Sequence, residues 1–318
     1  MLKKWLFSEL GLVLMTVLCS GLQSCKENNK DTDVVMAEEA MAKPQQNNPK
    51  KTLSQDFKDY WYAGKAEITS YILDQARYGE NRDGNAVLIY VTEPFLPEVQ
   101  VKADGSGADN IPVLKLNSTK NYLTGIYPYS IMTSSFYPVN ANQHALKVSF
   151  SAQEWCGQVY MQLNNREDFE VRSHSYFEAE ADQQMSLEKT VLENELWNQL
   201  RIDPKGLPMG SFNAIPSFEY IRLAHKPMKA YSAEATLEQS PEGNTYTLRY
   251  PELERSLTIA FNTTFPYEIT GWKETFTSGF GPSAKTMTTT AKKIRTITTP
   301  YWQQNSNEYL YLRDSLGL

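Results

Sequence analysis

From residue 65 onward, apolar and polar side chains alternate with a period of two over many short segments. Such alternation is typical of β-strands that bury one face, and the segments are rich in Tyr, Thr, Val and Ile. Turn residues at short spacing separate them, which favours antiparallel hairpins. The pattern predicts a mainly β fold, with a single large antiparallel sheet body of roughly ten or more strands. We expect an open or half-closed barrel with a few helices packed on it.

The turns between these strands are predicted from local residue types. Asp83-Gly84 suits a hairpin turn between strands at residues 65–79 and 85–95. Further turns are expected at residues 118–120, 240–244 and 278–283.

Three segments have the apolar spacing or the end signals of helices. The central segment has Ser186 in the position of an N-cap and Pro204 beyond its end. The predicted helical segments are residues 53–63, 186–204 and 300–316.

The N-terminal segment reads as a targeting signal rather than as part of the fold. Two lysines precede an apolar run from Leu10 to Leu18, which is too short to span a bilayer. The following Leu22-Gln23-Ser24-Cys25 resembles a bacterial lipobox, and the resemblance implies that Cys25 becomes an acylated first residue. An ordinary cleaved signal with an incidental cysteine is the alternative. We therefore expect a lipoprotein signal peptide at 1–24, a disordered tether at 25–52 and a β-rich globular domain at 53–318.

Composition narrows the function classes. The chain has a formal charge of −6, and removing the signal, with two lysines and one glutamate, leaves −7. Basic residues gather in no run longer than that in AKKIR, so no nucleic-acid partner is expected. The three histidines show no metal-ligand spacing, so neither a metal site nor another cofactor is predicted. Cys19 leaves with the signal, and acylation of Cys25 would leave Cys156 as the one free thiol.

Alternation assigns Cys156 to the polar side of its strand. In WCGQVYMQL the odd positions are apolar, and FEVRSHSYF repeats this phase. The even side chains form a candidate binding face for polar ligands such as glycans. The residues of this face are Gln158, Tyr160, Glu170, Arg172, His174 and Tyr176. The leading reading of this face is a polar sheet surface, either open to water or covered by a helix or loop, and a binding surface is the second reading.

The predicted register brings Cys156 towards a histidine. A hairpin centred on Arg166 sets Cys156 opposite Tyr176 and makes His174 its diagonal neighbour, about 7–8 Å away. The preceding turn is expected at Ala152-Gln153. A lone thiol in an oxidising envelope invites cross-linking, so we expect a helix or the curl of the sheet to cover Cys156. Catalysis by Cys156 with His174 is the alternative, although a thiol nucleophile needs a base within hydrogen-bond reach.

Several longer motifs resemble a family of Bacteroidota lipoproteins that often carry the label "septum formation inhibitor Maf". The shared motifs are WYAGKAEI, YGE, VLIYVTEPF, TGIYPYS, QEWCG, YMQLNNR and FPYEITGW, between Trp61 and Trp302. Genuine Maf proteins are α/β nucleotide pyrophosphatases with a Ser-x-Ser-Pro-Arg-Arg motif, and this chain has no Arg-Arg pair. The resemblance implies a location and no reaction.

Together these patterns predict a lipid-anchored cell-envelope protein with a non-catalytic binding or scaffolding role. Its expected place is the outer membrane, facing the periplasm or the cell surface. Its expected partners are the membrane, through the anchor, and a glycan, lipid or envelope-protein ligand. A cell-envelope hydrolase that uses Cys156 with His174 is the alternative function.

Overall fold

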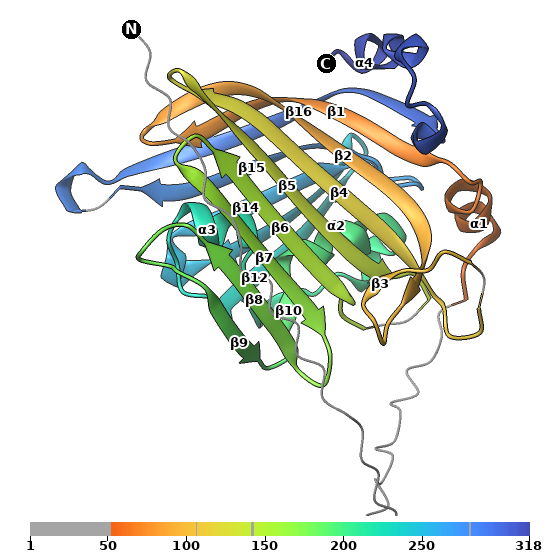
Figure 1. Ribbon diagram of the computed structural model, residues 1–318, viewed down its shortest axis with the longest axis horizontal. Helices are drawn as coiled ribbons and strands as arrows, with labels where there is room; N and C mark the ends of the chain where they lie inside the picture. The colour runs from red at the N-terminus through yellow and green to blue at the C-terminus, as the bar shows by residue number, and fades with distance from the viewer. Residues whose placement is uncertain (1–51, 106, 141–142, 280) are drawn as a thin grey trace, which may run out of the picture. The chain divides into compact units, whose positions relative to one another are not determined.

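The described part of the computed structural model comprises residues 52–105, 107–140, 143–279 and 281–318, and it contains one large sheet (Figure 1). This sheet has 16 strands, and all its pairs are antiparallel except β10 with β11. It is not closed into a barrel. The predicted mainly β fold with an open antiparallel sheet is therefore confirmed. The predicted signal peptide, Cys25 and almost all of the tether lie outside the described residues.

The sheet has two arms, which meet where β1 pairs with β16. Along the first arm the neighbours are β1, β2, β4, β5, β6, β7, β8 and β9, with the short β3 beside β2. Its strands are β1 (Ala66–Arg77), β2 (Glu80–Leu96), β3 (Val101–Lys102), β4 (Ile111–Thr124), β5 (Tyr127–Pro138), β6 (Lys147–Glu154), β7 (Gly157–Asn165), β8 (Phe169–Ser175) and β9 (Gln183–Leu187).

The second arm runs from β16 back to β10, with each strand beside its neighbour in sequence. Its strands are β10 (Val191–Leu192), β11 (Gly210–Ile215), β12 (Tyr231–Ser240), β13 (Gly243–Tyr250), β14 (Arg255–Phe261), β15 (Ile269–Ser278) and β16 (Lys285–Thr299). The two end strands, β9 and β10, are consecutive in the chain and are joined by residues 188–190. A linker of that length spans at most roughly 14 Å, so the sheet bends until its two ends come near each other.

Four α-helices accompany the sheet in the described residues. The helix α2 (Glu193–Ile202) and the short α3 (Phe218–Leu223) lie between the two arms, whereas α1 (Gln55–Trp61) and α4 (Tyr311–Leu316) lie at the periphery (Figure 1). Single 3₁₀ turns are η1 (Pro204–Gly206), η2 (Pro251–Leu253), η3 (Gly281–Ser283), η4 (Tyr301–Gln303) and η5 (Asn307–Tyr309).

The helix α2 is held by polar bonds as well as by its apolar side chains. The Asn198 Nδ2 donates to the carbonyl of Leu114 on β4 at 2.8 Å, and Ser135 on β5 donates to the Asn198 Oδ1. The main core surrounds Leu196 and Leu200 of this helix and includes inward side chains from both arms. The polar residues Asn194 and Asn198 of α2 are therefore buried together with its apolar ones.

Several predicted element boundaries were wrong. The central helix starts at Glu193 rather than after Ser186, because Ser186 lies in β9. The predicted C-terminal helix is broken into η4, η5 and α4. The helix at 53–63 is confirmed as α1, and α3 was not predicted.

The predicted turn at Asp83-Gly84 was also wrong, because both residues lie inside β2. The chain reverses instead at Tyr78 and Gly79, which have φ of 55° and 75°, as a type I′ hairpin requires. Residues 118–120 likewise lie inside β4, and the turn comes after Thr124. The turns predicted at 240–244 and 278–283 do connect β12 to β13 and β15 to β16.

Candidate functional site

The predicted binding face lies on the outer, solvent-exposed side of β7 and β8. In β7 the odd residues Val159, Met161 and Leu163 are buried, as alternation predicted. The even side chains point outward. All six predicted face residues are exposed, namely Gln158, Tyr160, Glu170, Arg172, His174 and Tyr176. The phase of the strands was therefore predicted correctly.

The predicted register along these strands was wrong by two residues. His174 pairs with Tyr160 rather than with Gln158, and the turn before β7 is at Trp155-Cys156 rather than at Ala152-Gln153. Cys156 therefore lies four residues from the position opposite His174, or roughly 13 Å along the strand. This separation is too large for the hydrogen bond that a Cys–His pair needs in the hydrolase alternative.

Cys156 is exposed at the tip of the β6–β7 hairpin, so the predicted cover over its thiol was wrong. The carboxylate of Glu154 accepts a hydrogen bond from the Cys156 backbone N at 2.6 Å. A hydrogen bond with Glu154 and its negative charge raise the pKa of the Cys156 thiol. His174 contacts Asp182, with 3.2 Å between Nδ1 and the carboxylate oxygen. The arrangement disfavours the thiolate that a nucleophile requires.

A wide surface hollow surrounds this hairpin tip, and we call it the outer hollow. Its volume is about 860 Å³, within the range of small-ligand sites. Two aromatic side chains belong to it, Trp155 at 68% exposed and Tyr176 at 79% exposed. Trp155 was predicted on the packed face, and its place in the turn explains the difference. The polar side chains of the outer hollow include Ser151, Gln153, Glu154, Gln158, His174 and Asp182.

One residue that lines the outer hollow, Gly157, has no room for a side chain. A Cβ on Gly157 would lie 2.9 Å from the Tyr176 Cδ1 and 3.4 Å from the Phe177 Cζ. The missing side chain therefore lets the Tyr176 ring lie against the start of β7.

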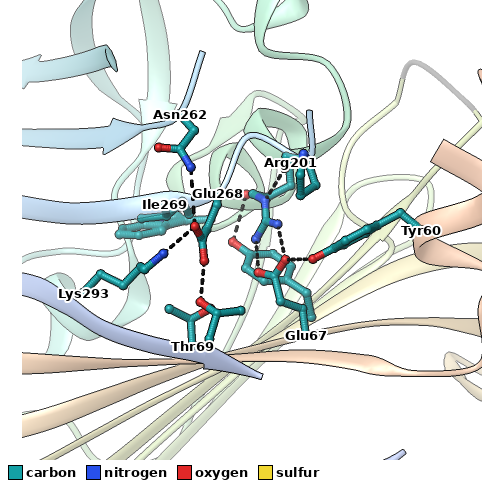
Figure 2. A network of polar contacts seen from close by, with 12 residues as sticks. Tyr60, Glu67, Thr69, Arg201, Asn262, Glu268, Ile269 and Lys293 are labelled. Atoms are coloured by element: carbon teal, nitrogen blue, oxygen red, sulfur yellow. Dashed lines mark hydrogen bonds and ion pairs between the residues drawn. The ribbon is translucent and has the colours of Figure 1, made fainter. Parts of the chain in front are cut away.

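A buried polar network elsewhere connects α1 and α2 to the sheet (Figure 2). Glu67 of β1 accepts two hydrogen bonds of 2.7 Å from Arg201 of α2 and one of 2.5 Å from the Tyr60 hydroxyl. The Arg201 guanidinium also lies 5.0 Å from the Trp61 ring centroid and 4.6 Å from that of Tyr90. Burial alone would raise the pKa of Glu67, but the Arg201 charge and these hydrogen bonds hold it below its ordinary value.

The same network continues to Glu268, which directly precedes β15 (Figure 2). Glu268 accepts hydrogen bonds from Lys293 at 2.5 Å and from Thr296, and Thr296 contacts Thr69 at 2.9 Å. Nearly all of the hydrogen-bond donors and acceptors in this network are paired within the protein. We therefore interpret this network as a brace for α2.

A second charged cluster lines a cavity between the two arms, which we call the inner cavity. Arg255 of β14 bonds both oxygens of Glu193 on α2, at 2.5 and 2.7 Å, and Glu274 of β15 at 2.6 Å. Lys120 of β4 contacts Glu219 of α3 at 2.7 Å. Burial would raise the pKa of Glu274, but Arg255 and Lys120 hold it below its ordinary value. The inner cavity holds about 50 Å³, room for roughly three to five waters.

Sequence reasoning missed the inner cavity, although one signal was present. Arg255 is in phase with the buried Leu257, Ile259 and Phe261 of β14. A charge in phase with an apolar set points towards the core and needs a partner there.

The comparisons with known proteins gave no match, either to a protein-family model or to a curated protein. The family resemblance stated above therefore remains an expectation. None of the helices in the described part of the chain has the length and apolar character needed to cross a membrane. The described residues also contain no group of three His, Cys, Asp or Glu side chains that could hold a metal ion.

Proposed function

We propose that this chain is a lipid-anchored cell-envelope protein that binds a glycan, without catalysis, in the outer hollow. The observation that carries the proposal is the pair of exposed rings, Trp155 and Tyr176, beside a polar surface of ligand size. Exposed aromatic side chains that gather at one concave place are typical of binding sites.

The chemistry of the outer hollow favours a glycan over an acyl chain. Aromatic rings can pack on the C–H faces of a sugar, while amide and carboxylate groups such as those of Gln158 and Asp182 can bond its hydroxyls. An acyl chain needs an enclosed apolar cavity, but the inner cavity of about 50 Å³ is small and strongly charged.

The hydrolase alternative has less support. The carboxylate of Glu154 raises the pKa of the Cys156 thiol, and His174 is several residues away along the strands. Neither feature activates a nucleophile at neutral pH.

The test of binding uses the full chain in detergent and a panel of soluble envelope oligosaccharides, with affinity measured by calorimetry. Trp155→Ala should weaken binding of the responding glycan at least tenfold, because the ring supplies the packing surface. Trp302→Ala is the matched control, since Trp302 is 45% exposed and lies in η4, outside the outer hollow. Equal affinity of the Trp155→Ala and unchanged proteins would refute the proposed site.

The anchoring part of the proposal rests on the sequence pattern that ends at Cys25. Cys25→Ala should move the protein from the membrane fraction to the soluble fraction, because the acyl chains supply the attachment. A Cys25→Ala protein that still partitions fully into detergent would contradict the lipid anchor. That result would not bear on the binding site in the outer hollow.

A further inference from the structure

We infer that the inner cavity is a binding site for a small organic cation, a primary ammonium ion with only a few heavy atoms. This inference concerns a different place from the outer hollow and does not depend on the proposed function. It rests on the charge, the aromatic walls and the unpaired polar groups that line one small cavity.

The charges around the inner cavity do not cancel. Its lining includes two cations, Lys120 and Arg255, and three carboxylates, Glu193, Glu219 and Glu274, so their formal sum is +2 − 3 = −1. Arg255 and Glu193 are almost fully buried, with side chains 1% and 2% exposed. The lining therefore carries one negative charge more than its cations match, and a bound cation would balance it.

Two of the carboxylates retain an oxygen for a ligand. Glu219 uses Oε1 for Lys120, and Glu274 uses Oε1 for Arg255. No side-chain or backbone donor within the described residues bonds the Oε2 of either one. Their side chains remain 15% and 13% exposed, so a water-sized group can reach them.

Aromatic walls suit an organic cation better than a bare metal ion. The rings of Trp197 on α2 and Trp272 on β15 meet edge to face, with centroids 5.4 Å apart. The Lys120 Nζ already lies 5.9 Å from the Trp272 ring centroid, which places an ammonium group at cation–π distance in the same cavity.

Further polar groups can receive or orient the ligand. Over the part of the chain that the structure describes, the Ser118 and Thr133 hydroxyls and the Asn194 Nδ2 have no hydrogen-bond partner, and all three residues line the inner cavity. The hydroxyls can accept from an ammonium group. The Asn194 Nδ2 can donate to a hydroxyl at the other end of the ligand.

The size of the cavity limits both the ligand and its affinity. A space of about 50 Å³ takes roughly three to five water-sized groups, which matches ethylammonium or ethanolamine. At the highest efficiency known for tiny ligands, four heavy atoms give a Kd no tighter than roughly 40 μM. Binding in the range from tens of micromolar to a few millimolar is therefore expected.

The experiment titrates the full chain with ethylammonium and ethanolamine at constant ionic strength, using saturation-transfer NMR and the shift in Tm. Both cations should saturate, whereas acetate, of equal size and opposite charge, should not. Saturation by acetate at the same concentrations, or no saturation by either cation, would overturn the inference.

Variants then assign the binding to this cavity. Glu274→Gln removes the net charge of −1 and keeps an acceptor for Arg255, so ethylammonium should bind at least tenfold more weakly. Glu252→Gln is the control, because Glu252 pairs with Lys229 on the surface, and its affinity should not change. Since Glu274→Gln risks unfolding, Thr133→Val provides a second variant that leaves every ion pair intact. Unchanged affinity in folded Glu274→Gln or in Thr133→Val protein would count against the inference.

Discussion

Arg201 of α2 and Glu67 of β1 meet through two parallel hydrogen bonds of 2.7 Å, and each side chain is 1% exposed. This geometry is the strongest that an arginine and a carboxylate can make. It joins the central helix to the strand where the two arms of the sheet meet. The pair is therefore expected to matter for stability far more than the surface ion pairs do.

Glu67→Gln should lower the free energy of unfolding by about 3–5 kcal/mol, because it leaves the Arg201 charge buried without its counter-ion. Urea unfolding followed by tryptophan fluorescence measures the change. Glu252→Gln breaks the exposed pair with Lys229 and should cost less than about 1 kcal/mol. If the two variants lost similar stability, the buried pair would not be the brace that the geometry indicates.

Acid should destabilise the fold by protonating the carboxylates of Glu67 and Glu274, which pair with arginines. Burial raises the pKa of Glu67 and Glu274, but Arg201 and Arg255 outweigh it and hold both below the ordinary 4.5. On unfolding, both carboxyls regain their ordinary pKa, so the unfolded chain binds protons more readily. The stabilisation is complete above about pH 4.5 and is lost as the pH falls through the folded values.

Urea unfolding between pH 7 and pH 3 tests this dependence. The midpoint should change little down to about pH 5 and then fall, and the fall should be shallower in Glu67→Gln. A midpoint that stayed constant to pH 3, or an equally steep fall in Glu67→Gln, would show that this carboxylate does not titrate as its surroundings require.

Gly84 provides a test of strand packing. It lies inside β2, and a Cβ there would be 2.4 Å from the Asn121 carbonyl oxygen and 2.9 Å from the Tyr122 Cβ. Gly84→Ala should therefore cost about 1–3 kcal/mol, because β4 must shift. Gly105→Ala is the matched control, since a Cβ there meets nothing within 4 Å. Both costs are read from thermal or urea unfolding, and a neutral Gly84→Ala would mean that the two strands separate easily.

The same glycine explains one failure of the sequence reasoning. Asp-Gly is the usual signal for a tight hairpin, but here the glycine serves the close approach of β4, and the turn residues are Tyr78 and Gly79. A single sequence does not distinguish these two uses of glycine, because both lie between alternating segments. The strand phase was predictable, since burial imposes it on every second residue, whereas the register depended on turns that several residues could form.

The two candidate sites also differed in how far the sequence predicted them. The outer face of β7 and β8 followed from alternation alone, with Tyr160 and His174 both outward as predicted. The inner cavity did not, because its charges come from β4, α2, α3, β14 and β15, which only the folded chain brings together. In-phase charges such as Lys120 and Arg255 indicate that a polar core exists, but not which residues pair across it.

The thiol of Cys156 should react rapidly in the native protein, because Cys156 lies exposed at the tip of the β6–β7 hairpin. Thiol reagents attack the thiolate, and the Glu154 carboxylate raises the pKa of this thiol. Glu154→Gln should therefore speed native labelling at pH 7.5 several-fold and leave the rate in urea unchanged. Asp182→Asn is the control. Asp182 contacts His174, so this variant should leave the rate of Cys156 labelling unchanged.

Labelling rates measured in stopped flow separate the remaining possibilities. Native labelling that stayed slow even in the Glu154→Gln protein and became fast only in urea would mean that a segment covers Cys156 in solution, as the sequence pattern had suggested. Equal native rates with and without the Glu154 carboxylate would mean that this group does not control the thiol. A several-fold increase on Glu154→Gln alone is the result that the hydrogen bond at the hairpin tip predicts, because only this variant removes the negative charge beside the sulfur.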